Sequence, residues 1–319
     1  MSYFKRGMLS LLATLCTATS LAQNNFDDVE IQTLHVQGNI YMLVGAGGNI
    51  TVQIGEEGIL IIDTMYEALA DRVYDAIREL SDAPLTFILN THGHPDHIGG
   101  NAVLAQRGSN IAGGNTVDLF AAGSGNQAKV VAHENVLTSI ISQDEPMAIE
   151  GWPTDTYFNE RKDLFFNGEA IVISHQPNAH TDGDSFVFFR RSDVIATGDI
   201  FTTTGYPYID VANGGTLQGI LDGLNNLLEM TVPADRQEGG TQIIPGHGRI
   251  ADEADVLVYR DMLTIIRDRI AYRIEQGDSL REVLASEPTY DYDARYGSDS
   301  GFWTTSNFIE AIYNELSMR

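Results

Sequence analysis

The segment Thr91-His92-Gly93-His94-Pro95-Asp96-His97 decides how this sequence is read. It directly follows Leu85–Leu89, an apolar run with the length of a buried strand. Loops at strand ends are where α/β folds place their chemistry. Imidazole and carboxylate groups suit zinc, and in extended backbone His92 and His94 share a side. The segment therefore predicts a metal site, in which Asp96 and His97 face a second ion.

Three further segments beside apolar runs offer the remaining ligands of such a site. They contain His180 just before a predicted strand, and Asp199 and His247 just after two others. Two zinc ions need three protein ligands each and an open position, and one carboxylate can bridge them. The alternative, a surface group of histidines without function, leaves these three segments unexplained.

The apolar runs elsewhere predict an α/β fold. Strands are expected at 31–36, 40–44, 50–54, 59–62, 85–89, 170–174, 185–189, 194–196 and 241–244. Helices are expected at 67–80, 100–106, 217–228, 252–275 and 306–316. Strand clusters flanked by helices in each half predict two packed sheets with helices outside. The less regular stretch from Gly123 to Glu160 is expected to be a loop or a lid over a site.

Residues 1–22 have the pattern of a signal peptide, which leaves 23–319 as one domain. Lys5 and Arg6 precede a short apolar run, and Ser20-Leu21-Ala22 is a small-residue cleavage pattern. The alternative is a membrane anchor, for which the apolar run is too short. The expected location is the periplasm or the medium, with no membrane anchor after cleavage.

The charge and the cysteine content restrict the partners. The 319 residues carry a formal net charge of −25, and removing Lys5 and Arg6 would leave −27. Such a surface repels nucleic acid and anionic membranes, so a small-molecule substrate is expected. Cys16, within the expected signal, is the sole cysteine, so no metal ligand of the mature chain is a thiolate. The oligomeric state does not follow from the sequence.

With these segments in place, the sequence resembles the metallo-β-lactamase superfamily from about Gln32 to His247. Asp63, in Ile61-Ile62-Asp63-Thr64, resembles the strand-end aspartate of that family. The resemblance implies an αββα sandwich with two zinc ions at one edge. It implies that Asp63 orients the ligand loop by hydrogen bonds. The implied ligands are His92, His94 and His180 for the first zinc, Asp96, His97 and His247 for the second, and Asp199 for both.

The ligand set resembles glyoxalase II, lactonases and related hydrolases more than dedicated β-lactamases. The best-known lactamase branch with a complete second site has cysteine at the position of Asp199 and arginine at that of His97. The resemblance implies a hydrolase in which a hydroxide shared by two zinc ions cleaves a lactone, ester, thioester or lactam. Iron and manganese also suit such ligands. A β-lactamase-like enzyme, a nuclease of the same superfamily and a non-catalytic metal-binding protein are the alternatives.

Four residues are candidates for catalysis or for substrate contact. Asp96 is expected to bind the second zinc and to steer the hydroxide. Tyr206 and Tyr208 follow Gly205 and are expected either to donate a hydrogen bond to a developing oxyanion or to pack in a loop. His133 is read as a helix-start residue with a satisfied hydrogen bond, and the alternative is a residue of the substrate pocket.

Overall fold

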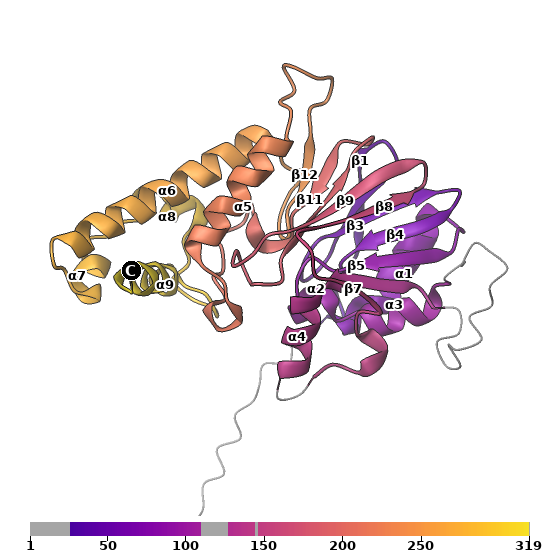
Figure 1. Ribbon diagram of the computed structural model, residues 1–319, viewed down its shortest axis with the longest axis horizontal. Coiled ribbons are helices and arrows are strands. Elements are labelled where there is room, and N and C mark those ends of the chain that lie inside the picture. Colours follow the sequence, from indigo (N-terminus) through magenta and orange to yellow (C-terminus); the bar gives the residue numbers. More distant parts are fainter. Residues whose placement is uncertain (1–25, 110–126, 144–145, 319) are drawn as a thin grey trace, which may run out of the picture.

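The computed structural model describes residues 26–109, 127–143 and 146–318, which form two mixed sheets (Figure 1). The seven-stranded sheet consists, in spatial order, of β1 (Gln32–Gln37), β2 (Ile40–Val44), β3 (Ile50–Gly55), β4 (Gly58–Ile62), β5 (Leu85–Leu89), β6 (Lys129–His133) and β7 (Asp155–Tyr157). The five-stranded sheet consists of β12 (Gln242–Ile244), β11 (Val194–Ala196), β10 (Ser185–Phe189), β9 (Glu169–His175) and β8 (Arg161–Phe166).

The two sheets face each other across one apolar core, and helices cover their outer faces. Successive side chains of a strand point to opposite faces, so both faces of β4 are apolar. Leu60 and Ile62 belong to the core shared with the second sheet, whereas Ile59 and Ile61 pack in the core that contains the helix residues Val73 and Leu104. The predicted αββα sandwich is therefore confirmed.

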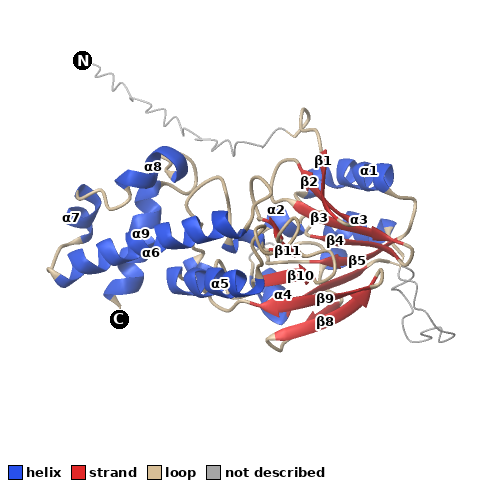
Figure 2. Cartoon of the chain, turned by 90° about the horizontal axis from the view of Figure 1, so that it is seen from above, coloured by secondary structure: helices blue, strands red, loops and turns tan. Residues whose placement is uncertain are grey.

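The helices fall into two groups. Beside the first sheet lie α1 (Ala70–Leu80), α2 (Pro95–Ile98), α3 (Asn101–Arg107) and α4 (Glu134–Ser142). Beyond the second sheet lie α5 (Leu217–Met230), α6 (Glu253–Glu275), α7 (Leu280–Ala285), α8 (Tyr290–Tyr296) and α9 (Thr305–Ser317). Figure 2 shows α6 to α9 gathered at one end of the molecule. They share a buried cluster with the second sheet, in which Phe186 of β10 joins Tyr259 of α6 and Phe308 of α9.

Side-chain caps explain where three of these helices begin. The side chain of Asp252 accepts from the backbone N–H of Asp255 at the start of α6, and that of Thr216 accepts from Gly219 at the start of α5. Thr304 and Asn307 form a reciprocal capping box at α9. Such caps satisfy N–H groups that have no partner within the helix.

Several sequence predictions need correction. Among the described residues, the stretch 123–160 is not an irregular loop or lid, because it supplies β6, α4 and β7. β6 pairs in parallel with both β5 and β7, so Val130 and Val131 are core residues. Strand β8 was missed because Arg161, Lys162 and Asp163 begin it, and an edge strand tolerates such charges. Helices α7 and α8 were also missed.

The predicted signal peptide, residues 1–22, lies outside the described residues. None of the described helices has both the length and the apolar composition needed to cross a membrane.

Candidate metal centre

The candidate ligands gather where strands of both sheets end at a common edge. β4 and β5 are parallel, so Asp63 and the segment 91–97 leave the first sheet side by side. β11 and β12 are also parallel, which brings Asp199 and His247 to the facing edge of the second sheet. The β9–β10 connection adds His180, because β10 is antiparallel to β11 and begins at that edge. Residues distant in sequence thus converge by topology alone.

Two groups of ligand atoms result. His92, His94, His180 and Asp199 form one, and Asp96, His97 and His247 form the other. Within each group the ligand atoms lie within 4.8 Å of one another. All seven predicted ligands are therefore brought together, and Asp199, which the resemblance assigned to both ions, groups with the first three histidines.

The outer ring nitrogens of the first three histidines are held by hydrogen-bond acceptors. His94 donates from Nε2 to Oδ2 of Asp210 over 2.8 Å, and His180 donates from Nδ1 to the carbonyl oxygen of Tyr208 over 2.7 Å. His92 places Nδ1 3.1 Å from Oγ1 of Thr91. A neutral imidazole has one N–H, so these contacts leave the lone pair on the inner nitrogen.

The inner nitrogens of these histidines face one another. Nδ1 of His94 lies 3.1 Å from Nε2 of His92 and 2.9 Å from Nε2 of His180. A proton on an inner nitrogen would charge a buried ring. Burial lowers the pKa of His180 to about 4, and burial together with the neighbouring His97 lowers the pKa of His92 well below its usual range. Three lone pairs directed at one point are a donor set that fits a metal cation.

Carboxylate oxygens lie close to both histidines of the second group. Oδ1 of Asp199 lies 3.2 Å from Nε2 of His97, and Oδ2 of Asp96 lies 3.4 Å from Nε2 of His247. Burial opposes a charge on His247, but Asp199 and Asp96 together outweigh burial and raise the pKa of His247 to about 9. For His97, Asp199 and Asp63 likewise outweigh burial and raise the pKa well above its usual range. This half of the centre attracts positive charge.

Asp199 lies between the two groups. Its Oδ2 is 3.3 Å from Nε2 of His247 and 3.8 Å from Nε2 of His180. Its Oδ1 is buried and accepts no hydrogen bond from the described residues. A buried carboxylate oxygen without a donor is costly unless a cation is bound to it. The residues present therefore fit a metal pair that shares Asp199.

Asp63 lies behind the ligand loop. Its Oδ1 accepts from the backbone N–H of Thr91 over 2.8 Å, and its Oδ2 accepts from Oγ1 of Thr91 over 2.7 Å. The same Oδ2 accepts from Nδ1 of His97 over 2.8 Å, which turns Nε2 of that ring toward the centre. One carboxylate thereby orients ligands of both groups, through Thr91 for His92 and directly for His97.

Two glycines allow the backbone to approach the centre. A Cβ atom at Gly48 would collide with the ring of His97, and one at Gly246 would collide with Oδ1 of Asp199. Any larger residue at either position would displace a candidate ligand.

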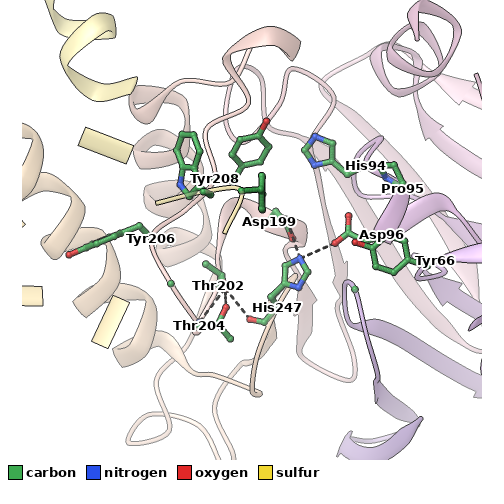
Figure 3. Close-up of a pocket in the computed structure, with 14 residues that line it drawn as sticks. Tyr66, His94, Pro95, Asp96, Asp199, Thr202, Thr204, Tyr206, Tyr208 and His247 are labelled. Atoms are coloured by element: carbon green, nitrogen blue, oxygen red, sulfur yellow. Dashed lines mark hydrogen bonds and ion pairs between the residues drawn. The ribbon is translucent and has the colours of Figure 1, made fainter. Parts of the chain in front are cut away.

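The centre opens into a cavity of about 660 Å³ (Figure 3). His94, Asp96, Asp199 and His247 lie on its floor, beside Thr202 and Thr204. The rings of Tyr66, Tyr208, Phe302 and Trp303 contribute to its walls. A cavity of this volume holds a small molecule.

The oxyanion role considered for Tyr206 is not supported. Its hydroxyl donates to Oδ1 of Asp293 over 2.8 Å and points away from the centre in Figure 3. Its ring stacks on Phe308 at 4.6 Å. Tyr206 therefore links its loop to the C-terminal helices. Tyr208 lies closer to the centre, with its ring 5.5 Å from that of His180.

His133 lies apart from the ligands, at the start of α4. Its Nδ1 accepts from the backbone N–H of Asn135 over 3.3 Å, and its ring stacks on His175 at 3.7 Å. The structure therefore agrees with the helix-start interpretation, and His133 does not line the cavity that contains the centre.

Sequence reasoning missed Thr91 as a hydrogen-bonding partner, as well as Asp210, Phe302 and Trp303. Asp210 comes two residues after Tyr208, without any metal-ligand spacing, and Phe302 and Trp303 precede the last helix. The sequence offered one signal, for Asp210, which is an acidic residue that directly follows the uncharged run from Ile200 to Ile209.

Comparison with known proteins agrees with this geometry. The family model of the metallo-beta-lactamase superfamily matches residues 43–248, and the chain belongs to this superfamily. Over 164 residues it is 31% identical to hydroxyacylglutathione hydrolase GloC of Haemophilus influenzae, covering 50% of this chain and 68% of that protein. Over 215 residues it is 20% identical to metallo-beta-lactamase type 2 of Bacillus sp. (strain 170), and the match covers 65% of this chain and 69% of that protein.

Solved structures share the fold at low identity. The sec-alkylsulfatase Pisa1 from Pseudomonas sp. superposes with a TM-score of 0.65 at 14% identity over 89% of this chain, which spans half the length of that protein. The DIM-1 metallo-beta-lactamase superposes with a TM-score of 0.54 at 16% identity over 74% of this chain and 99% of its own. The chain is thus a hydrolase of a typically zinc-dependent superfamily, with a His/Asp cluster arranged for metal binding.

Proposed function

We propose that this chain is an exported hydrolase that holds two zinc ions and cleaves a lactone, ester, thioester or lactam in a small molecule. The observation that carries the proposal is the position of Asp199, whose oxygens lie 3.2 Å from His97 and 3.3 Å from His247 while Oδ2 is 3.8 Å from His180. One carboxylate between two nitrogen-rich groups is the arrangement that a metal pair needs.

The proposed roles follow from the contacts. His92, His94 and His180 would hold the first ion, Asp96, His97 and His247 the second, and Asp199 both. Zinc ions bound there would lower the pKa of water to supply a nucleophile and would polarise the substrate carbonyl. Asp96 lines the cavity floor, where its carboxylate can orient the attacking water and take up a proton. Asp63 and Asp210 keep the imidazoles in their orientation.

Metal analysis of the purified protein tests the site. We expect two zinc ions for each chain, and about one in Asp199→Ala. The exposed His35 on β1 offers a matched control, because His35→Ala removes an imidazole that lies outside the centre. Protein that stays metal-free in zinc buffer would overturn the proposal and favour a role without catalysis.

Ring opening tests the substrate class. The zinc-loaded protein is assayed with a β-lactam and with an acyl-homoserine lactone, beside His94→Ala and His35→Ala. Fast lactone opening that needs His94 supports a lactonase-like hydrolase. Fast lactam opening supports the β-lactamase alternative, in which Asp199 takes the place of cysteine. Cleavage of RNA dependent on His94 would instead identify a nuclease.

Export is a separate part of the proposal and rests on the pattern of residues 1–22 alone. Expression of the full chain in a bacterium, followed by fractionation, tests it. We expect a mature N-terminus at Gln23 in the periplasmic or secreted fraction. An intact N-terminus in the cytoplasmic fraction would contradict it.

A further inference from the structure

One wall of the cavity comes from outside the part of the chain that the family model matches. Phe302 and Trp303 lie between α8 and α9, whereas the matched region ends at residue 248. Both rings contact Tyr208 edge to face, with centroids 5.0 Å and 4.8 Å apart. Tyr208 in turn lies 5.7 Å from the ring of His94, so the aromatic wall reaches the candidate ligands.

Trp303 is fixed, whereas Phe302 is exposed. Nε1 of Trp303 donates to the carbonyl oxygen of Pro207 over 3.0 Å, which anchors the indole to the loop that carries Tyr208. Phe302 is 80% exposed, although it contacts Tyr208 and lines the cavity. An exposed phenylalanine at a cavity mouth offers apolar area that a ligand can cover.

The aromatic wall of the cavity has no strongly basic side chain beside it in the described part of the chain. Among the described residues that line it there is no lysine or arginine, whereas Asp96 and Asp199 lie on its floor. The whole chain carries −25. In the residues that the structure describes, no lysine or arginine lines the cavity beside Tyr208, Phe302 and Trp303, so a carboxylate, phosphate or sulfate on the non-reacting part of a substrate would lose water there without gaining an ion-pair partner.

We propose, on the basis of the proposed function, that the substrate is an uncharged ester or lactone with an apolar acyl chain that lies on Phe302, Trp303 and Tyr208. The aromatic wall covers the acyl chain of the substrate, while the carbonyl group of the substrate lies over the candidate ligands on the cavity floor. The segment between α8 and α9 thus determines specificity in a site whose ligands come from the ends of the strands of the two sheets.

An ester series measures this specificity. The zinc-loaded protein is assayed with 4-nitrophenyl acetate, butyrate, hexanoate and octanoate. Each added methylene group that the aromatic wall covers on one side should raise kcat/KM about twofold. Complete burial of a methylene group would raise kcat/KM up to about fourfold. An octanoate analogue whose chain ends in a carboxylate should lose at least about tenfold against octanoate.

Variants locate the effect. Phe302→Ala should lower the ratio of octanoate to acetate kcat/KM about fivefold, since the chain loses one face of its contact. Phe165→Ala is the matched control, because Phe165 is a comparably exposed ring, at 69%, on β8. Its octanoate-to-acetate ratio should equal that of the unmodified protein.

A binding measurement separates this inference from the proposed function. The chain has two tryptophans, so the emission of a Trp152→Phe variant comes from Trp303 alone. Octanamide titrated into this metal-free variant should shift the Trp303 emission to saturation. Adding Phe302→Ala should weaken octanamide binding about fivefold.

The outcomes are distinct. If octanamide binds but no ester, thioester, lactone or lactam is hydrolysed, the proposed function fails and the apolar wall stands. If esters are hydrolysed with a flat dependence on chain length and octanamide leaves Trp303 unchanged, the wall is overturned and the hydrolase stands. A preference for the chain that ends in a carboxylate would also overturn the inference.

Discussion

Nε2 of His94 donates a hydrogen bond to Oδ2 of Asp210 over 2.8 Å, although the two residues are 116 positions apart. The carboxylate fixes both the tautomer and the direction of a candidate zinc ligand. Burial raises the pKa of Asp210, but the hydrogen bonds from His94 and Asn213, with the charge of His94, together outweigh burial and hold that pKa at about 2. Asp210 therefore stays ionised and is the anionic partner of the first ligand group.

Asp210→Asn should weaken one of two zinc affinities about tenfold to hundredfold, because a neutral amide replaces the anionic acceptor of His94. In the unmodified protein the backbone N–H of Asn213 donates to Oδ1 of Asp210. The side-chain oxygen of an asparagine at position 210 can accept the same hydrogen bond, so the turn keeps its cap. Competition with a calibrated chelator measures both affinities. Asp222→Asn, in the exposed pair with Gln218 on α5, is the control. Unchanged affinities in Asp210→Asn would show that the contact is incidental.

Asp63→Asn should lower the affinity for the other zinc ion by a similar factor, because Nδ1 of His97 loses the carboxylate that accepts its hydrogen bond. The affinity for the first ion should change less, because Asp63 reaches His92 only through Thr91. Asparagine tolerates the left-handed backbone at this position, where φ is 64°. The double variant with Asp210→Asn should show both affinities lowered. If only one zinc affinity is lowered in the double variant, Asp63 and Asp210 act on the same ion, and their assignment to different ions is wrong. The exposed Asp71, changed to Asn, controls for loss of charge.

Tyr206→Phe should leave kcat within about twofold and lower the free energy of unfolding by about 1 kcal/mol. The hydroxyl bonds Asp293 rather than facing the centre, so its removal costs one hydrogen bond and keeps the stack on Phe308. Urea unfolding and ester hydrolysis measure the two effects. A fall in kcat of about a hundredfold, the usual cost of an oxyanion donor, would restore the oxyanion role.

Acid should destabilise the metal-free protein partly through His133. Burial, with the stacked His175, lowers the pKa of His133 from 6.5 to about 4. The unfolded chain therefore binds this proton first, and the stability is fully present above about pH 6.5 and lost as the pH falls toward about 4. The expected contribution is about 1 to 2 kcal/mol.

Urea unfolding at pH 7 and pH 4.5 checks this prediction. His133→Asn keeps an asparagine cap at the start of α4 and removes the titrating ring. The loss of stability between the two pH values should be smaller in His133→Asn than in the unmodified protein. His35→Asn, on the exposed face of β1, should lose as much as the unmodified protein does. Equal losses in His133→Asn and the unmodified protein would exclude His133 as an acid-sensitive group.

The sequence by itself determined the sandwich and the identity of the candidate ligands. Consecutive apolar positions such as Ile59 and Leu60 already indicate a strand buried on both faces, since successive side chains of a strand point to opposite faces. The segment from His92 to His97 carries its own chemistry, because the ligand types are local in sequence. β8 escaped this reasoning because the charges of an edge strand hide its pattern.

Only the tertiary structure decided which residues surround the ligands. Asp210 meets His94, and Phe302 meets Tyr208, through chain reversals that no local period encodes. Tyr206 illustrates the reverse case, since its place beside Gly205 pointed to the site while its hydroxyl bonds Asp293. Ligand identity depends on the chemistry of single residues. The direction of a side chain depends on the elements packed around it, and these come together only in the folded chain.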